Sequence, residues 1–139
     1  MTMARSFLDS NIIIYANDSR DPEKQDRALA CLEKHIREGT GVISTQVLQE
    51  YASVAVQKLK QAVPIILQQL YLLESLLVVT VVPPLVRRAL EIRELYSLSF
   101  WDSQILAAAE STGCGEILTE DLNPGQIYCG IRCVNPLLH

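Results

Sequence analysis

Short apolar segments alternate with longer segments of helical periodicity along this chain, and this alternation constrains the fold more than any other feature. We expect the strands at residues 4–8, 42–43, 77–82, 116–119 and 127–134, where the residues are apolar or β-branched. One or two helix-like segments separate most of them. Parallel strands need such crossover connections, which place helices over the sheet. The sequence therefore predicts an α/β fold, a three-layer α/β/α sandwich with a central, mainly parallel sheet.

Capping and turn residues indicate where the helices begin and end. Asp21 and Pro22 are typical of an N-cap followed by the first helical position, and Gly39 is typical of a helix end. We expect Thr45 to cap the next helix. Further helices are expected to begin near Ile12, Pro64, Pro84 and Trp101.

Composition limits the class of protein. The 139 residues are 49% hydrophobic and 20% charged, which suits one domain over residues 1–139. The formal net charge of −4 excludes coating of nucleic acid through overall positive charge. No apolar run reaches the roughly 18 to 20 residues of a membrane span, and no apolar segment of signal-peptide length opens the chain. We expect a cytoplasmic protein with no membrane partner.

The four cysteines are expected to be reduced thiols, because a chain of this size folds without disulfide bonds. Cys114, Cys129 and Cys133 lack the CxxC spacing and the nearby histidine pair typical of a zinc site.

Four acidic residues lie just after predicted strands or in the helices that follow them. Asp9 follows the first strand, and Glu50 lies in the opening turns of the helix after the second. Asp102 opens the helix before the fourth strand, and Asp121 follows that strand, preceded by Glu120. Ligands of open α/β sheets bind beyond the carboxyl ends of the strands, so a parallel sheet would bring these carboxylates to one edge. Taken singly, each acid also fits a helix cap or a solvated surface position.

The surroundings of two of these acids favour a metal site. Asp102 shares a helix face with the apolar Ile105 and Leu106, and Glu50 also lies among apolar residues. A carboxylate on a core-facing stripe is costly without a cationic partner, and the sequence supplies few cations nearby. Several carboxylates suit Mg²⁺ or Mn²⁺, whereas zinc prefers His and Cys.

Two polar residues accompany the acids. Asn11 lies two residues after Asp9, and Thr119 lies two residues before Asp121. Their amide and hydroxyl oxygens can add metal ligands or orient the carboxylates.

Four short motifs carry these residues: Phe7-Leu8-Asp9-Ser10-Asn11, Leu48-Gln49-Glu50-Tyr51, Trp101-Asp102-Ser103-Gln104-Ile105 and Leu118-Thr119-Glu120-Asp121-Leu122. In this order and spacing they resemble the motifs of PIN-domain ribonucleases, and the size and layout resemble the VapC-type toxins of prokaryotic toxin–antitoxin pairs. The resemblance spans essentially the whole chain. It implies that Asp9, Glu50, Asp102 and Asp121 form a catalytic acidic quartet supported by Asn11 and Thr119, with Glu120 as an additional candidate acid.

The resemblance further implies an Mg²⁺- or Mn²⁺-dependent endoribonuclease that hydrolyses RNA phosphodiester bonds as the toxin of a type II pair. By similarity to the family, Asp9, Asp102 and Asp121 hold the metal, and Glu50 either completes its shell or accepts a proton from the attacking water. Neither histidine suggests a metal-independent route, since His35 is expected on a surface helix and His139 is the last residue.

The partners implied by the resemblance are the RNA substrate, a second copy of the chain and an antitoxin whose C-terminal segment blocks the acidic site. Abundant Leu and Ile at residues 63–77 fit burial in a dimer, and they equally fit burial within the monomer. The basic residues that could contact RNA also fit a solvated helix face with pairs such as Arg87 with Glu91. These residues are Lys58, Lys60, Arg87, Arg88 and Arg93.

Three alternative functions stay open at this point. The chain could be a PIN-domain RNA-processing protein that is not a toxin, an inactive PIN-like interaction module, or an Mg²⁺-binding phosphoacceptor signalling domain. The last fits poorly, because Ser10 follows Asp9 where such domains cluster acids, and because no lysine occurs after Lys60.

Overall fold

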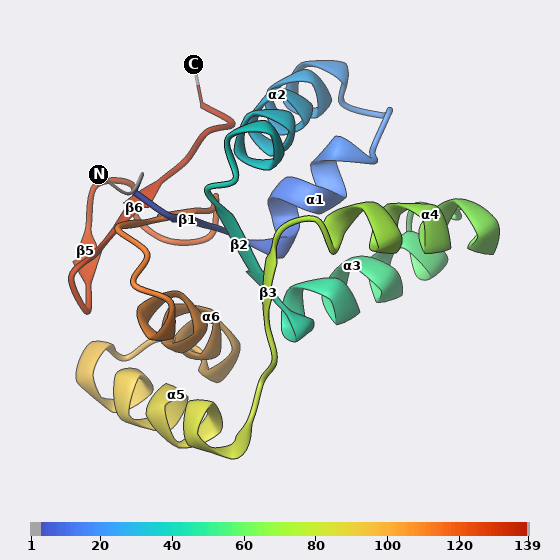
Figure 1. The fold of residues 1–139 in the computed structure, drawn as a ribbon. Coiled ribbons are helices and arrows are strands. Elements are labelled where there is room, and N and C mark those ends of the chain that lie inside the picture. Colours follow the sequence, from blue (N-terminus) through green and yellow to red (C-terminus); the bar gives the residue numbers. More distant parts are fainter. Residues whose placement is uncertain (1–3, 139) are drawn as a thin grey trace.

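The computed structural model describes residues 4–138, which form helices and strands in alternation (Figure 1). In chain order the elements are β1 (Ser6–Leu8), α1 (Ser10–Ala16), α2 (Pro22–Glu38), β2 (Gly41–Ser44), α3 (Thr45–Gln57), α4 (Val63–Leu73), β3 (Leu77–Val79), α5 (Pro83–Tyr96), α6 (Phe100–Ser111), β4 (Glu116–Leu118), β5 (Ile127–Tyr128) and β6 (Ile131–Val134).

The strands form one sheet in the order β3-β2-β1-β4-β6-β5. Neighbouring strands are parallel except β5 and β6, which are antiparallel. In the register of the central strands, Ser6 of β1 lies opposite Gly41 of β2 and Glu116 of β4. The chain builds the sheet outward from β1 in one direction through β2 and β3, and then continues on the other side of β1 with β4. The carboxyl ends of β1 and β4 thus flank the switch point at which open α/β sheets bind ligands.

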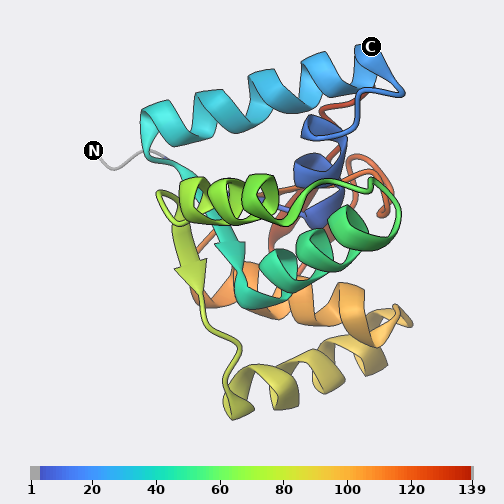
Figure 2. The same cartoon turned by 90° about the vertical axis from the view of Figure 1, so that its right-hand side faces the viewer.

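Helices cover both faces of the sheet (Figures 1 and 2). Helix α6 packs against one face, and α5 packs on α6. Helices α1, α2 and α3 pack on one another or on β2 at the opposite face, and α4 packs beside α3. The predicted three-layer α/β/α sandwich with a mainly parallel sheet is confirmed.

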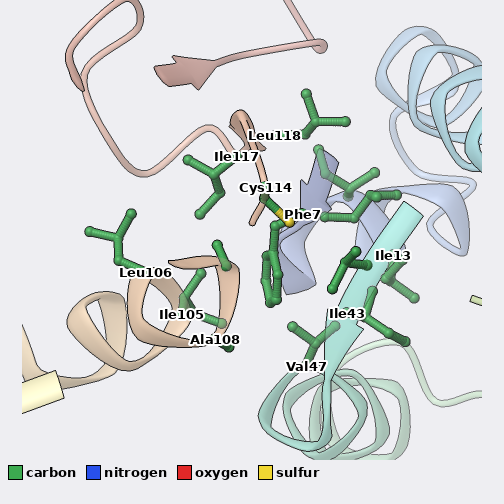
Figure 3. Packing of buried hydrophobic residues seen from close by; sticks show 14 of the residues in the cluster. Phe7, Ile13, Ile43, Val47, Ile105, Leu106, Ala108, Cys114, Ile117 and Leu118 are labelled. Carbon is green, nitrogen blue, oxygen red and sulfur yellow. The ribbon is translucent and has the colours of Figure 1, made fainter. Parts of the chain in front are cut away.

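The core consists of apolar side chains from the central strands and the helices that flank them. Figure 3 shows Phe7 of β1, Ile43 of β2 and Ile117 of β4 together with side chains from α3 and α6. These three residues are fully buried. Burial of each such side chain contributes about 1.5–3 kcal/mol, which holds the short strands in place despite their few ladder hydrogen bonds.

The predicted boundaries of α2 are confirmed. The Asp21 carboxylate accepts a hydrogen bond from the Lys24 backbone N–H (3.2 Å), and Pro22 occupies the first turn. Gly39 ends the helix in the left-handed conformation (φ 68°), which a residue without a Cβ adopts without strain.

Three predictions about local structure are wrong. Ser44, not Thr45, is the N-cap of α3: its hydroxyl accepts from the Val47 N–H, while the Thr45 hydroxyl accepts from the Val81 N–H. The expected buried strand at 77–82 is only Leu77–Val79, and it lies at the sheet edge with a single neighbour. The expected fifth strand at 127–134 is the hairpin of β5 and β6, because Cys129 and Gly130 both have positive φ and turn the chain.

His35 lies on the outer helix α2, as expected, but its side chain is buried on the inner face of that helix. It lies on the same face of α2 as the buried Ala28 and Leu32, and its Nδ1 is 2.8 Å from the Thr40 hydroxyl. Thr40 precedes β2, so His35 lies at the amino ends of the strands, away from the acids that follow them. His139 lies outside the described residues.

Two further observations concern predictions from composition. All four cysteines carry free thiols. Within residues 4–138, no helix combines the length and the apolar character needed to cross a membrane.

Candidate metal site and active site

Three aspartates from distant parts of the chain meet at the carboxyl edge of the sheet. Asp9, Asp102 and Asp121 each place one carboxylate oxygen within 4.8 Å of the other two. Asp9 directly follows β1, Asp102 lies in the first turn of α6, and Asp121 lies in the loop after β4. The fold thus brings together three of the four acids singled out by the sequence.

Asp9 is held rigidly at the centre of this group. Its backbone N–H donates to the Leu118 carbonyl (3.0 Å), which joins the ends of β1 and β4. One carboxylate oxygen accepts from the Ser10 N–H (2.7 Å), as expected of the N-cap of α1. The other accepts from the Thr119 hydroxyl (2.8 Å). Both oxygens are therefore oriented by the backbone and by β4.

The buried position of Asp9 disfavours its charged form. The pKa of Asp9 is raised from 3.8 to about 7, chiefly by burial and in addition by the neighbouring charges of Asp121 and Glu50, while the hydrogen bonds from Thr119 and Ser10 oppose the rise. The charges that act on Asp9 are thus negative like its own. A cation bound among these carboxylates would remove this repulsion.

Asp102 and Glu50 show the same pattern at half-buried positions. Burial raises the pKa of Asp102, with a further rise from the charge of Asp121, while a hydrogen bond from Ser99 opposes it. Burial also raises the pKa of Glu50; the charges of Asp102 and Asp121 add to this, and a hydrogen bond from Gln46 opposes it. Glu50 therefore lies beside the three aspartates but outside their close group.

Asn11 and Thr119 contact the aspartates directly. The Asn11 amide nitrogen donates to Asp121 (3.0 Å), and the Thr119 hydroxyl accepts from the Asp121 backbone N–H (3.1 Å). Two buried oxygens nearby, Asn11 Oδ1 and Glu50 Oε1, have no hydrogen-bond partner. Unsatisfied buried oxygens are unusual and call for an unseen partner such as an ion or water.

The residues present fit a hard divalent cation. The donors are carboxylate and amide oxygens, which suit Mg²⁺ and Mn²⁺ and not zinc. The raised pKa of Asp9 and the two unpartnered oxygens are both compatible with a cation at this place. The cysteines considered for zinc take no part in this group.

Glu120 and Arg88 form ion pairs outside the aspartate group. The Glu120 carboxylate pairs with Lys24 (3.2 Å) and lies outside the group of three aspartates. Arg88 pairs with Glu110 (2.8 Å) and with Glu91 (3.6 Å), so Glu91 takes Arg88 as its partner and not the suggested Arg87.

Sequence reasoning missed the polar residues that support two of the acids. Ser99 caps α6 by accepting from the Asp102 N–H (3.1 Å), a role that its position three residues before an acid could have revealed. Gln46 and Gln104 form a buried amide pair (2.9 Å) between α3 and α6. Nothing in the local sequence indicates that pairing, because the two residues are 58 positions apart.

The switch point in the strand order, the aspartate group and the α/β/α layers together define a class of fold, and comparison with known proteins identifies that class. The family model of the PIN domain matches residues 6–128, and the chain therefore belongs to the PIN domain family. The search of curated proteins gave no match.

Solved structures share the fold at low sequence identity. A toxin–antitoxin complex from Klebsiella pneumoniae aligns with a TM-score of 0.70 and 20% identity, covering 94% of this chain and 97% of that one. VapC20 from Mycobacterium tuberculosis, described as a toxin that cleaves the sarcin–ricin loop, aligns with a TM-score of 0.69 and 16% identity over 84% of this chain and 89% of its own. VapBC2 from Rickettsia felis, bound to a promoter DNA fragment, aligns with a TM-score of 0.66 and 19% identity over 92% and 96%.

Proposed function

We propose that this protein is a metal-dependent endoribonuclease that hydrolyses RNA phosphodiester bonds as the toxin of a type II toxin–antitoxin pair. The observation that carries the proposal is the group of three aspartates within 4.8 Å at the switch point of the sheet. Membership of the PIN family and the fold shared with toxin–antitoxin proteins, one described as a toxin that cleaves the sarcin–ricin loop, support it.

Each acid has a defined role in this proposal. Asp9, Asp102 and Asp121 hold Mg²⁺ or Mn²⁺, and Asn11 and Thr119 keep the carboxylates oriented. When bound, the cation supplies charge neutralisation at the phosphate and activation of water. The fourth acid, Glu50, has a separate role.

Glu50 accepts the proton of the attacking water. Its pKa is raised by burial and by Asp102 and Asp121, which moves it toward the operating pH, as a general base requires. The nearby Gln46 amide opposes part of this rise in the pKa of Glu50.

The proposal extends to the partners and the compartment. We infer a cytoplasmic protein that forms a homodimer and is inhibited by an antitoxin. Support for the dimer comes from α4, where Leu67 and Tyr71 are largely exposed. Support for the antitoxin comes from the structural neighbours, several of which are toxin–antitoxin complexes.

Cleavage of end-labelled RNA tests the function. Wild-type protein should cut members of a panel of single-stranded and hairpin RNAs with Mg²⁺ or Mn²⁺ and leave them intact with EDTA. Asp102→Asn should lower the rate by at least about 10²-fold, because it removes charge from the metal site. Asp26→Asn, the same change at an exposed position of α2, should leave the rate unchanged.

Two results would count against this function. Cleavage that persists in EDTA, or in Asp102→Asn, would exclude the metal mechanism. If host cells that express the wild type grow at the same rate as cells that express Asp102→Asn, the toxin assignment fails, even where the purified protein still cleaves RNA.

A further inference from the structure

A cavity of about 400 Å³ lies between α3 and the start of α6, where Glu50 and Trp101, the residue before Asp102, form part of its lining. The residues from α3 recur at helical spacing, so one face of this helix forms the wall. The lining residues are Gln46, Gln49, Glu50, Ser53, Val54 and Trp101. Glu50 belongs both to this cavity and to the acidic site, so a ligand in the site can extend into the cavity.

Trp101 is held in place and yet leaves most of its side chain in solvent. Its ring packs edge-on against Phe100, with centroids 5.2 Å apart and an angle of 82° between the planes. Its backbone carbonyl accepts a hydrogen bond from the Gln46 amide (3.2 Å), and Gln104 in turn donates to Gln46 (2.9 Å). The side chain of Trp101 is nevertheless 62% exposed.

An exposed tryptophan costs free energy that a soluble chain normally avoids, since burial of an indole is strongly favourable. Here the exposed ring belongs to the second residue of α6, directly before Asp102 of the proposed metal site. An aromatic face presented beside a phosphodiester-binding site is the feature by which proteins stack the bases of single-stranded nucleic acid.

The chemistry of the cavity favours a base over a phosphate. Its side chains are an indole, an aliphatic group, amides, a hydroxyl and one carboxylate, and none of them is cationic. A phosphate would be repelled by Glu50, whereas a neutral base can stack on Trp101 and form hydrogen bonds with the amide of Gln49 or the hydroxyl of Ser53.

We propose that this cavity is a nucleobase subsite in which Trp101 stacks one base of single-stranded RNA next to the scissile phosphodiester. The proposal rests on the proposed ribonuclease function and adds the form of the substrate: the base beside the cut is unpaired and inserted between α3 and α6.

Trp101 is the sole tryptophan of the chain, so its fluorescence reports on the cavity alone. Homopolymeric RNA decamers of A, U, C and G, added to wild-type protein in EDTA at low ionic strength, should quench this fluorescence. Binding should be followed in parallel by the anisotropy of end-labelled RNA. Quenching should saturate at the same RNA concentration as the anisotropy.

Variants then test the stack. Trp101→Ala should weaken RNA binding about tenfold, because each base–aromatic stack contributes substantially to affinity, and Trp101→Phe should recover most of it. Leu95→Ala removes a similarly exposed apolar side chain on α5, away from both the cavity and α4, and should leave the RNA affinity unchanged. With cleavable RNA and Mg²⁺, Trp101→Ala should raise KM about tenfold with kcat within about twofold, since stacking contributes equally to ground-state and transition-state binding.

The outcomes separate the subsite from the enzyme function. RNA that binds without quenching, or unchanged affinity and KM in Trp101→Ala, would overturn the subsite while cleavage still supports the ribonuclease. Wild-type protein that neither binds nor cleaves RNA would overturn both. Loss of affinity for a protein partner in Trp101→Ala, with RNA binding intact, would reassign the cavity to that partner and overturn the subsite.

Discussion

At the scale of single residues, the unusual feature is a carboxylate buried among carboxylates. Asp9 is only 5% exposed, and its hydrogen bonds from Ser10 and Thr119 do not offset the cost of burying its charge. The metal-free protein therefore holds Asp9 in a form that is easily protonated. Such unfavourable local electrostatics are typical of functional sites, where the ligand supplies the missing charge.

The pH dependence of stability should reveal this cost. The pKa of Asp9 is about 7 in the folded protein and near 3.8 when unfolded, so the stability from its protonation is complete below about pH 4 and is lost as the pH rises through about 7. In EDTA, Asp9→Asn should gain in free energy of unfolding relative to wild type over this range, reaching roughly 1–3 kcal/mol at pH 8. Urea unfolding from pH 4 to 8 measures the difference.

A saturating divalent cation should reverse the order of the two proteins, because it binds the folded wild type and not the variant. A difference between them that does not change with pH would contradict the buried, repelled state of Asp9. Asp26→Asn serves as the matched control and should follow the wild type at every pH.

At the scale of secondary structure, the ends of helices do most to place the site. Asp9 caps α1, Ser44 caps α3 ahead of Glu50, and Ser99 caps α6 with Asp102 in its first turn. Strands β1 and β2 carry Asp9 and Ser44 to the carboxyl edge of the sheet, whereas Ser99 reaches its place through the short connection between α5 and α6. At the start of β2, a Cβ added to Gly41 would lie 2.6 Å from a methyl carbon of Leu76, so the residue there must be small.

The cap of α3 should contribute measurably to stability. Ser44 is fully buried, and its hydroxyl accepts from the Val47 N–H (3.4 Å). Ser44→Ala should lower the free energy of unfolding by about 1 kcal/mol, because it leaves this N–H without a partner. Ser53→Ala, the same substitution at an exposed position within α3, should change it by less than about 0.5 kcal/mol. Equal effects of the two substitutions in urea unfolding would rule out the capping role.

At the scale of the whole molecule, exposed apolar side chains gather on α4. Val63, Ile65, Leu67, Tyr71 and Leu72 of this helix are exposed, with Tyr71 at 81%. An exposed apolar surface of this kind is typical of an interaction site. The alternative of burial within the monomer, which the sequence left open for residues 63–77, holds only for some of them, such as Ile66 and Leu73.

The homodimer should therefore depend on α4. Wild-type protein should have about twice the chain mass of 15.5 kDa by size-exclusion chromatography with light scattering. Tyr71→Glu combined with Leu67→Glu should give the monomer mass, because burying two carboxylates in an apolar interface is costly. Leu95→Glu, at an equally exposed position on α5, should stay dimeric. A monomeric wild type, or a dimeric double variant, would exclude α4 as the interface.

The sequence by itself determined the layers of the fold and the candidate acids. The periodicity of apolar residues and the positions of turn residues are local properties of the sequence. They predicted the alternation of strands and helices, both ends of α2, and the edge of the sheet at which the carboxylates lie. The positions of Asp9 and Asp121 follow from that alternation, since parallel strands place their carboxyl ends together. Asp102 joins them from the first turn of α6.

Only the tertiary structure decided which side chains meet. Glu120 and Asp121 are sequence neighbours, yet Glu120 pairs with Lys24, 96 residues away, while Asp121 joins the aspartates. Gln46 and Gln104 likewise come together across 58 residues. These pairings depend on the rotation and packing of helices against the sheet, which no local pattern encodes, because the free energy that selects them comes from contacts between segments far apart in the chain.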